Sequence, residues 1–356
     1  MGMDAAADPR ADYPVLLKRV LAGEHLNADE MAGMIGAIVD ETLSPVRAAA
    51  LLAALAGKGE TVDELVGAAR AMRERSVRVE HRLPLVLDIV GTGGDGACTI
   101  NISTAAALIV AGCGVPVAKH GNRAASSACG SADVLEALGV KIDRSAEDSA
   151  RSLREGNICF LFAQRHHPAM RAVGPIRREL GVRTVFNLLG PLTNPAGANR
   201  QLIGVARPEY VELIAEGLRA LGAEAGAVIH GEDGLDEISG ESPTRVVQFD
   251  RDGMRRWTLD PARYGVHASR AAIRGGTPET NAKALLAILE GERSPRADLV
   301  LLNASLALVV AGEAVDIDDG IARARTAVET GRGRAALEAL RMERETDPST
   351  GLRVTV

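Results

Sequence analysis

Short apolar runs, polar loops and segments of helical periodicity alternate from residue 85 onward, and this alternation limits the fold more than any other feature. The run from Leu85 to Val90 leads directly into a glycine-rich loop at 91–96, and a helix is expected from Ser103 to Ala111. The same order returns after further apolar runs at 115–119, 158–163, 201–206 and 227–230. Strands that alternate with helices favour a mainly parallel sheet flanked by helices.

Ligands of such sheets bind beyond the carboxyl ends of the strands, where the following loops meet. The sequence therefore predicts that four loops converge, those at Gly91, His120, His166 and Gly231. Pro116 indicates that the second strand starts late or lies at an edge, because proline cannot donate a ladder hydrogen bond.

Residues 13–78 have a helical pattern with three start signals. Asn27 with Glu30, and Thr61 with Glu64, have the spacing of a capping box, and Ser44 precedes a proline. The expected fold class is α/β, with a small helical N-terminal lobe and a large lobe around a mainly parallel sheet. We expect a small domain at 13–80, completed by helices within 168–185, and a large domain at 81–356.

Composition excludes several classes of protein. A net charge of −6 argues against a nucleic-acid-binding protein, which needs a basic face, and an aromatic content of 2% leaves few platforms for stacking bases. The four cysteines have neither zinc-ligand spacing nor the pattern of a secreted disulfide framework. Because no signal-peptide or membrane-spanning run is present either, we expect a cytoplasmic protein that binds no membrane.

The loop at 91–96 has the composition of an anion-binding loop. Its four glycines let the backbone turn tightly and present N–H groups without interference from Cβ atoms. The spacing is neither that of nucleotide hydrolases nor that of dinucleotide-binding folds, and a purely structural turn is the alternative. Residues 101–104, Asn-Ile-Ser-Thr, can cap the next helix and direct hydroxyl groups at a phosphate near its positive end.

Two further segments have chemistry that suits a phosphorylated substrate. Residues 119–127 carry two cations, a histidine and two hydroxyls, although a solvated basic turn has the same composition. Asp236 and Glu237 follow a turn-like segment and offer the hard oxygen ligands that Mg²⁺ prefers, although an acidic surface turn would look the same.

Together with residues 160–163, 167–170 and 183–195, these blocks closely resemble the anthranilate phosphoribosyltransferase family. The resemblance extends from the helical start almost to the C-terminus, and its motifs are long and ordered. It implies a two-lobed homodimer that uses Mg²⁺ in tryptophan biosynthesis. The implied reaction joins anthranilate to 5-phosphoribosyl 1-diphosphate and yields N-(5-phosphoribosyl)anthranilate and diphosphate.

Carried over position by position, the resemblance implies three sets of site residues. Those for phosphoribosyl diphosphate are Gly91, Gly94, Asp95, Thr99, Asn101, Ile102, Ser103, Thr104, Lys119, His120, Gly121, Asn122, Arg123, Ala124, Ala125, Ser126, Ser127 and Ser131. Those for Mg²⁺ are Ser103, Asp236 and Glu237. Those for anthranilate are Gly91, Asn122 and Arg177.

Arg177 suits its implied role because a guanidinium can bind both oxygens of a carboxylate, whereas an ordinary helix-surface arginine is the alternative. The chain departs from the family pattern at Gln164, where proline is usual, and at Cys98 and Cys129. None of these three is an implied ligand.

The implied mechanism needs no side chain as a general base, because the aromatic amine of anthranilate is already neutral. His120 is the nearest candidate, and we expect it to orient substrate or a loop instead. A nucleoside phosphorylase of similar fold is a second enzyme hypothesis, but a nucleobase has no carboxylate for Arg177 to bind. An inactive relative that binds nucleic acid is a third hypothesis, and the net charge of −6 weighs against it.

Overall fold

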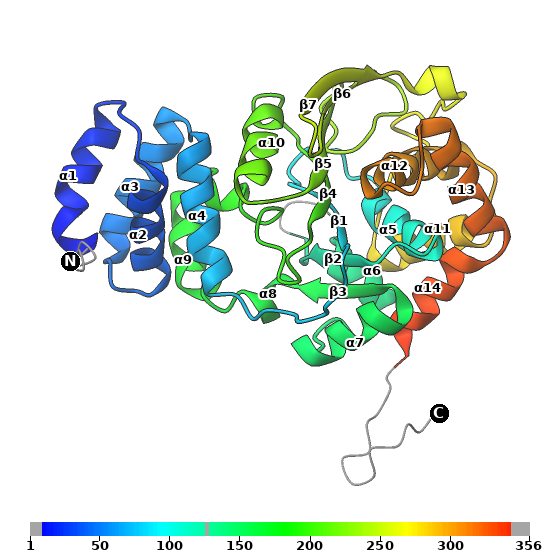
Figure 1. The fold of residues 1–356 in the computed structure, drawn as a ribbon, viewed down its shortest axis with the longest axis horizontal. Coiled ribbons are helices and arrows are strands. Elements are labelled where there is room, and N and C mark those ends of the chain that lie inside the picture. Colours follow the sequence, from blue (N-terminus) through cyan, green and yellow to red (C-terminus); the bar gives the residue numbers. More distant parts are fainter. Residues whose placement is uncertain (1–8, 125–127, 343–356) are drawn as a thin grey trace, which may run out of the picture.

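The computed structural model describes residues 9–124 and 128–342, in which a helical lobe packs beside a larger α/β lobe (Figure 1). The helical lobe begins with α1 (Pro9–Leu21), α2 (Ala28–Val39), α3 (Pro45–Lys58) and α4 (Val62–Glu74). It is joined by the later helix α9 (Met170–Leu180), which packs against α2 and α3 and follows the short α8 (Ala163–His166). No helix in the described part of the chain is long and apolar enough to cross a bilayer.

The predicted helix starts are confirmed. Asn27 and Thr61 each form a complete capping box, with Glu30 and Glu64 respectively, and the Ser44 side chain caps α3. Such caps supply hydrogen-bond partners to N–H groups that the first turn of a helix leaves unpaired. Between Glu74 and β1 the chain crosses to the large lobe without forming a helix or strand. The division at residues 80 and 81 remains a prediction.

A sheet of seven described strands lies at the centre of the large lobe, in the order β3-β2-β1-β4-β5-β6-β7. The first five strands in this order are parallel, and β6 and β7 complete the sheet as an antiparallel hairpin. This arrangement confirms the expected fold class. The strands are β1 (Leu87–Gly91), β2 (Val117–Gly121), β3 (Ile158–Phe162), β4 (Arg200–Gly204), β5 (Ala225–Gly231), β6 (Thr244–Phe249) and β7 (Met254–Leu259). Of the two outcomes predicted from Pro116, the late start is correct, since β2 begins at Val117 and lies inside the sheet.

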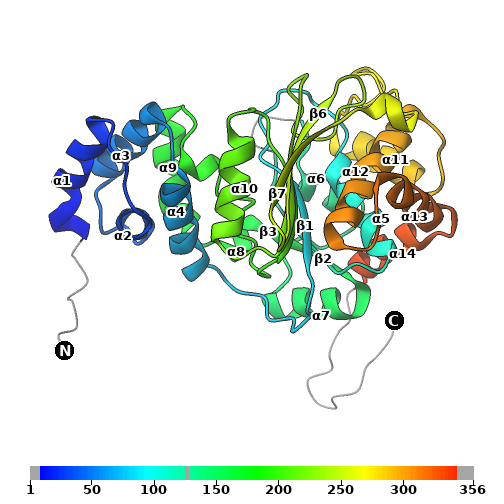
Figure 2. The same cartoon turned by 45° about the horizontal axis from the view of Figure 1, so that its top comes forward.

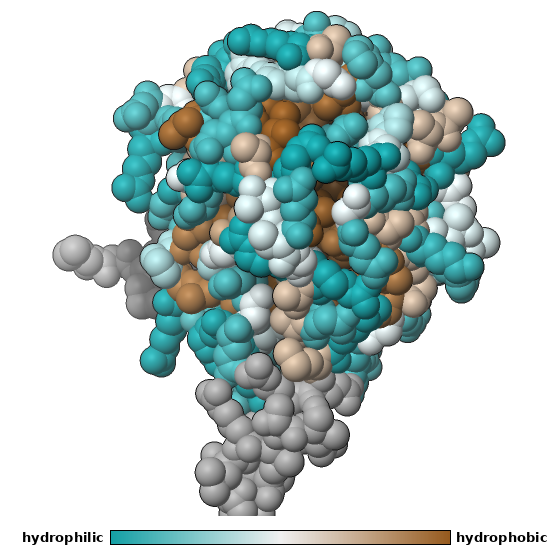
Figure 3. Space-filling view, turned by 90° about the vertical axis from the view of Figure 1, so that its right-hand side faces the viewer, coloured by the Kyte–Doolittle hydropathy of each residue, from teal (hydrophilic) through white to brown (hydrophobic). Residues whose placement is uncertain are grey.

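Helices cover both faces of the sheet (Figures 1 and 2). One face packs mainly against α5 and the C-terminal helices around a large apolar core. The outer surface of the molecule, at the end away from the helical lobe, is mostly hydrophilic, with apolar side chains visible between the polar ones (Figure 3). The remaining elements are α5 (Ile102–Gly112), α6 (Ser131–Ala137), α7 (Ala146–Gly156), η1 (Val185–Asn187), α10 (Tyr210–Ala220), η2 (Pro261–Tyr264), α11 (Pro278–Leu289), α12 (Pro295–Ala311), α13 (Ile317–Glu329) and α14 (Arg332–Arg341).

The other face of the sheet shares its core with the helical lobe. Leu65 of α4, Leu218 of α10 and Phe249 of β6 belong to one continuous cluster of buried apolar side chains. Arg73 of α4 reaches across the junction, where its Nε donates to the carbonyl oxygen of Leu192 at 2.7 Å. The two lobes are therefore joined by apolar packing as well as by the connecting chain.

Candidate active site

The loops that follow β1, β2 and β5 meet at the carboxyl edge of the sheet. The Gly93 N–H donates to Asp236 Oδ2 at 2.6 Å, and the Ser103 N–H donates to Glu237 Oε1 at 3.1 Å. Lys119 Nζ donates to Ser103 Oγ at 3.3 Å. The structure therefore brings together the glycine loop, the start of α5, the end of β2 and the acidic pair.

Two glycines are required where the acidic pair approaches the strands. A Cβ atom on Gly91 would lie 2.4 Å from Asp236 Oδ2, and one on Gly204 would lie 1.7 Å from the Asp236 carbonyl oxygen. Within the loop itself, Gly93 has φ +68° and Gly94 has φ +77°, a region that L-amino acids with side chains rarely adopt. These two positions of the loop therefore favour glycine.

The acidic pair is buried beside other charged side chains. Burial raises the pKa of both carboxyls, and the negative charge of Asp95 raises that of Asp236 further. Repulsion from Asp236 also raises the pKa of Glu237, and the Lys119 ammonium opposes this effect. Repulsion between these carboxylates means that a cation bound between them would be stabilised.

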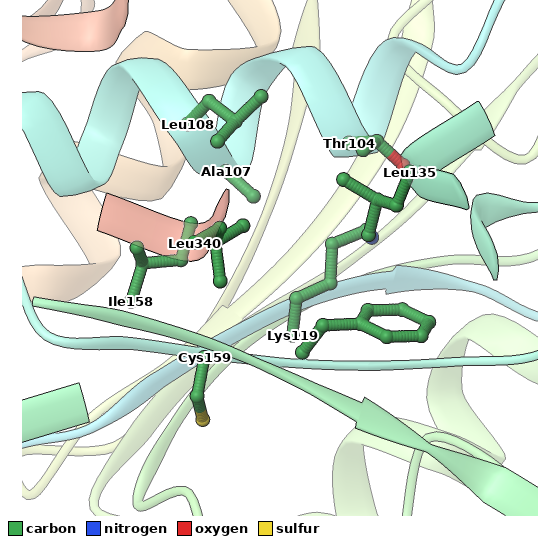
Figure 4. Close-up of a pocket in the computed structure, with 9 residues that line it drawn as sticks. Thr104, Ala107, Leu108, Lys119, Leu135, Ile158, Cys159 and Leu340 are labelled. Carbon is green, nitrogen blue, oxygen red and sulfur yellow. The ribbon is translucent and has the colours of Figure 1, made fainter. Parts of the chain in front are cut away.

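Lys119 is itself buried, and burial lowers the pKa of its ammonium group. Its Nζ donates to the Ile89 carbonyl oxygen at 2.7 Å as well as to Ser103. In the close-up, the side chain extends from β2 toward α5 beside Thr104 (Figure 4). The apolar gap drawn there, between α5, β2, β3 and α14, is too small to admit a water molecule, so it is a packing defect and not a substrate pocket.

Asp88 is a buried carboxylate that the sequence reasoning did not assign to the site. It accepts hydrogen bonds from the His120 N–H at 3.2 Å and from Asn194 Nδ2 at 2.8 Å. Burial raises its pKa to about 6, against the attraction of Lys119. The sequence did offer a signal for Asp88, because it is a charged residue inside the apolar run at 85–90. A carboxylate is rarely buried in a strand unless other groups pair with it.

His120 is buried close to Gly190. Its Nδ1 lies 3.0 Å from the Gly190 carbonyl oxygen, which makes Nδ1 the proton-bearing atom of the neutral ring. Nε2 has no partner among the described residues, and the ring centroid of His167 lies 5.1 Å away. Burial lowers the His120 pKa to about 3, so at neutral pH its ring is a poor proton acceptor.

The loop after β2 is fastened at both ends by Asp133, whose Oδ2 accepts from the N–H groups of Ala124 and Gly130, each at 2.9 Å. Arg123 pairs with Asp133 at 3.0 Å and with Glu136 at 2.8 Å, so its guanidinium faces α6 in this structure. Among the implied ligands, Ala125, Ser126 and Ser127 lie outside the described residues.

Gly121 and Ser131 lie side by side, since a Cβ atom on Gly121 would be 2.1 Å from Ser131 Oγ. Asn122 is exposed, and its Oδ1 lies 3.5 Å from Gln164 Nε2. Gln164 therefore contacts an implied anthranilate ligand directly, so this departure from the family pattern borders the site.

One expectation about residues 101–104 is wrong. Asn101 is the N-cap residue of α5, but its side chain makes no capping hydrogen bond. Instead Nδ2 donates to the Cys129 carbonyl oxygen at 3.2 Å, because Cys129 and Asn281 bring competing partners to this point. Ile102 and Thr104 are buried, and Thr99 forms an isolated bridge with Arg274.

Arg177 lies near the end of α9 and is half-buried. Burial lowers the pKa of its guanidinium, and no described carboxylate pairs with it. Within residues 9–124 and 128–342, its side chain forms no hydrogen bond with the glycine loop. Arg183, which follows α9, does contact that loop: its Nη2 donates to the Gly93 carbonyl oxygen at 3.0 Å. Sequence reasoning included Arg183 in a motif but gave it no role.

Comparison with known proteins gives a consistent result. The helical bundle domain of a glycosyl transferase family matches residues 14–76, and the a/b domain of that family matches residues 83–334. The chain is 50% identical over 332 residues to an anthranilate phosphoribosyltransferase of Thermomicrobium roseum, covering 92% of this chain and 95% of that relative.

Solved structures are similar over nearly the whole chain. The anthranilate phosphoribosyltransferase of Thermus thermophilus superposes with a TM-score of 0.87 at 45% identity, covering 94% of this chain and 100% of that one. The Saccharomyces cerevisiae enzyme in complex with PRPP and Mg superposes with a TM-score of 0.84 at 28% identity, covering 93% and 97%.

Proposed function

The chain belongs to the anthranilate phosphoribosyltransferase family, and we propose that the loops at the carboxyl edge of its sheet form the active site of that reaction. The reaction transfers the 5-phosphoribosyl group of 5-phosphoribosyl 1-diphosphate (PRPP) to the amine of anthranilate, in tryptophan biosynthesis. The observation that carries the proposal is the contact of the glycine loop and the start of α5 with the acidic pair.

The diphosphate end of PRPP occupies the glycine loop and the start of α5. Backbone N–H groups there present partial positive charge, and Lys119 adds a full charge beside Ser103. As the bond from the ribose C1 to the diphosphate lengthens, negative charge grows on the leaving oxygens. Donors that are already in place stabilise this charge without reorganising.

Mg²⁺ is held by Ser103, Asp236 and Glu237. The donor set fits this ion, because carboxylate and hydroxyl oxygens are its usual ligands, and burial together with mutual repulsion raises the pKa of both carboxyls, so a bound cation would stabilise their charged forms. No three described acidic, histidine or cysteine side chains form a ready-made metal cluster. Substrate phosphates and water would complete its coordination shell, as is usual for Mg²⁺. When bound, the ion neutralises charge on the diphosphate.

Anthranilate is placed by Arg177, Asn122 and the backbone at Gly91. A half-buried guanidinium without a carboxylate partner is prepared to receive the carboxylate of a substrate. The amine of anthranilate attacks C1 of the ribose as the bond from C1 to the diphosphate breaks, and the proton on the new secondary amine passes to solvent or to the released diphosphate. His120 holds its ring through Gly190 and does not take the proton in this scheme.

The fluorescence of anthranilate tests the proposal. With enzyme present, emission falls only when PRPP and Mg²⁺ are both added, and a chelator stops the fall. Arg177→Ala raises the KM for anthranilate by about tenfold or more, the cost of a lost charge-assisted hydrogen bond, while the exposed neighbour Arg178→Ala serves as the control. No loss of emission at high enzyme concentration would refute the assignment.

A homodimer and a cytoplasmic location complete the proposal. Val15 and Leu21 of α1 and Val46 of α3 are exposed apolar residues of the helical lobe, with 61%, 68% and 80% of their surfaces accessible. Covering these side chains with a second copy would remove apolar surface from water. Sedimentation velocity of the intact protein distinguishes one copy from two.

A further inference from the structure

The Gly93 residue is held from two sides by side chains that are distant in sequence. Asp236 Oδ2 accepts from its N–H at 2.6 Å, and Arg183 Nη2 donates to its carbonyl oxygen at 3.0 Å. Neither partner belongs to the loop. Because glycine has the widest choice of backbone conformations, a loop with four glycines needs such outside partners to adopt a single shape.

The hydrogen bond from Arg183 to the Gly93 carbonyl oxygen also orients the N–H of Gly94. The carbonyl of Gly93 and the N–H of Gly94 belong to one planar trans peptide unit and point in opposite directions. When Arg183 holds the carbonyl, it also sets the direction of the Gly94 N–H. That N–H donates no backbone hydrogen bond within the described residues, and Gly94 is exposed.

Arg183 is free to act in this way. Its side chain is half-buried, and no described carboxylate forms an ion pair with it. A Cβ atom on Gly94 would lie 2.5 Å from Arg183 Nη2, so the guanidinium packs directly against the loop. The start of η1, where Asn187 Oδ1 accepts from the Thr184 N–H at 3.0 Å, anchors the backbone beside Arg183.

We propose that Arg183 is a positioning residue that directs the Gly94 N–H toward the diphosphate of PRPP. This inference rests on the proposed function, in which the glycine loop binds that diphosphate. Without the guanidinium, rotation of the Gly93–Gly94 peptide turns a carbonyl oxygen toward the phosphates. Both the lost donor and the misplaced oxygen weaken anion binding.

Two substitutions separate this role from a structural one. Arg183→Met removes the donor and keeps an unbranched side chain, whereas Arg183→Lys keeps a donor and the charge. We expect Arg183→Met to raise the KM for PRPP and the inhibition constant of inorganic diphosphate by about tenfold, as for one hydrogen bond to a charged group. The KM for anthranilate and the melting temperature stay near the wild-type values, and Arg183→Lys restores part of the affinity.

Arg178→Met is the matched control, because Arg178 is an exposed arginine on the neighbouring helix α9. It should leave all four quantities unchanged. If Arg183→Met leaves the diphosphate inhibition constant within twofold of wild type, or weakens anthranilate to the same degree as PRPP, the inference is wrong. Absence of wild-type turnover would instead contradict the proposed function, so the two failures are distinguishable.

Discussion

Substitution of Asp88 by asparagine should change how the stability of the protein depends on pH. Burial raises the pKa of this carboxyl from 3.8 to about 6 in the folded chain. The difference corresponds to about 3 kcal/mol, because one pKa unit is worth about 1.36 kcal/mol. Well below pH 4 the carboxyl is protonated in both states. As the pH rises toward 6 the unfolded chain ionises first, so the contribution to stability is lost through this window.

Urea unfolding between pH 4 and pH 7 measures the effect, with Trp257, the one tryptophan, reporting from β7 in the central sheet. Subtracting the Asp88→Asn curve from the wild-type curve removes the titrations that the two proteins share. The difference in unfolding free energy should fall by about 2 kcal/mol between pH 4 and pH 7, because part of the titration of the unfolded chain lies below pH 4. A difference that rises with pH would refute the reasoning, because it would mean that attraction by Lys119 outweighs burial.

Three further substitutions test other parts of the structure. Gly91→Ala should lower kcat/KM about a hundredfold in steady-state assays, because its Cβ would lie 2.4 Å from Asp236 Oδ2. Gly57→Ala is the control and should leave kcat/KM unchanged, because a Cβ atom at this position on α3 meets only open space. Glu64→Gln should lower the unfolding free energy by about 3 kcal/mol in urea titrations, because the buried Glu64 pairs with Lys58 at 2.9 Å, and an unchanged midpoint would contradict this. His120→Ala should keep measurable turnover, and complete loss in a folded variant would restore His120 as a general base.

The order of strands and helices was predictable because its signals are local. Each apolar run, glycine loop and capping residue lies within a few positions of the element that it defines. The capping boxes at Asn27 and Thr61 formed as their spacing predicted. The resemblance to a family then located implied ligands on loops that the structure does bring together at one edge of the sheet.

Long-range partners were not predictable in the same way. Asp88 meets Asn194 across 106 positions, and Arg183 meets Gly93 across 90 positions, so no local pattern indicates either contact. Asn101 has the residue type of a helix cap, yet tertiary partners outcompete the cap and its side chain contacts Cys129. The capping propensity of a residue does not decide its hydrogen bonds where distant side chains offer better partners.

In the proposed site, Arg177 of the helical lobe acts together with the glycine loop of the large lobe, and the shared core supports this arrangement. Val173 lies four positions before Arg177 on α9, so the two side chains occupy the same face of the helix. Val173 is fully buried in the cluster that also contains Leu65 of the helical lobe and Val228 of the sheet. Close packing in that cluster resists displacement of α9. Apolar burial therefore fixes the position of Arg177 relative to the sheet that carries the glycine loop. No direct contact between Arg177 and the loop is needed for this.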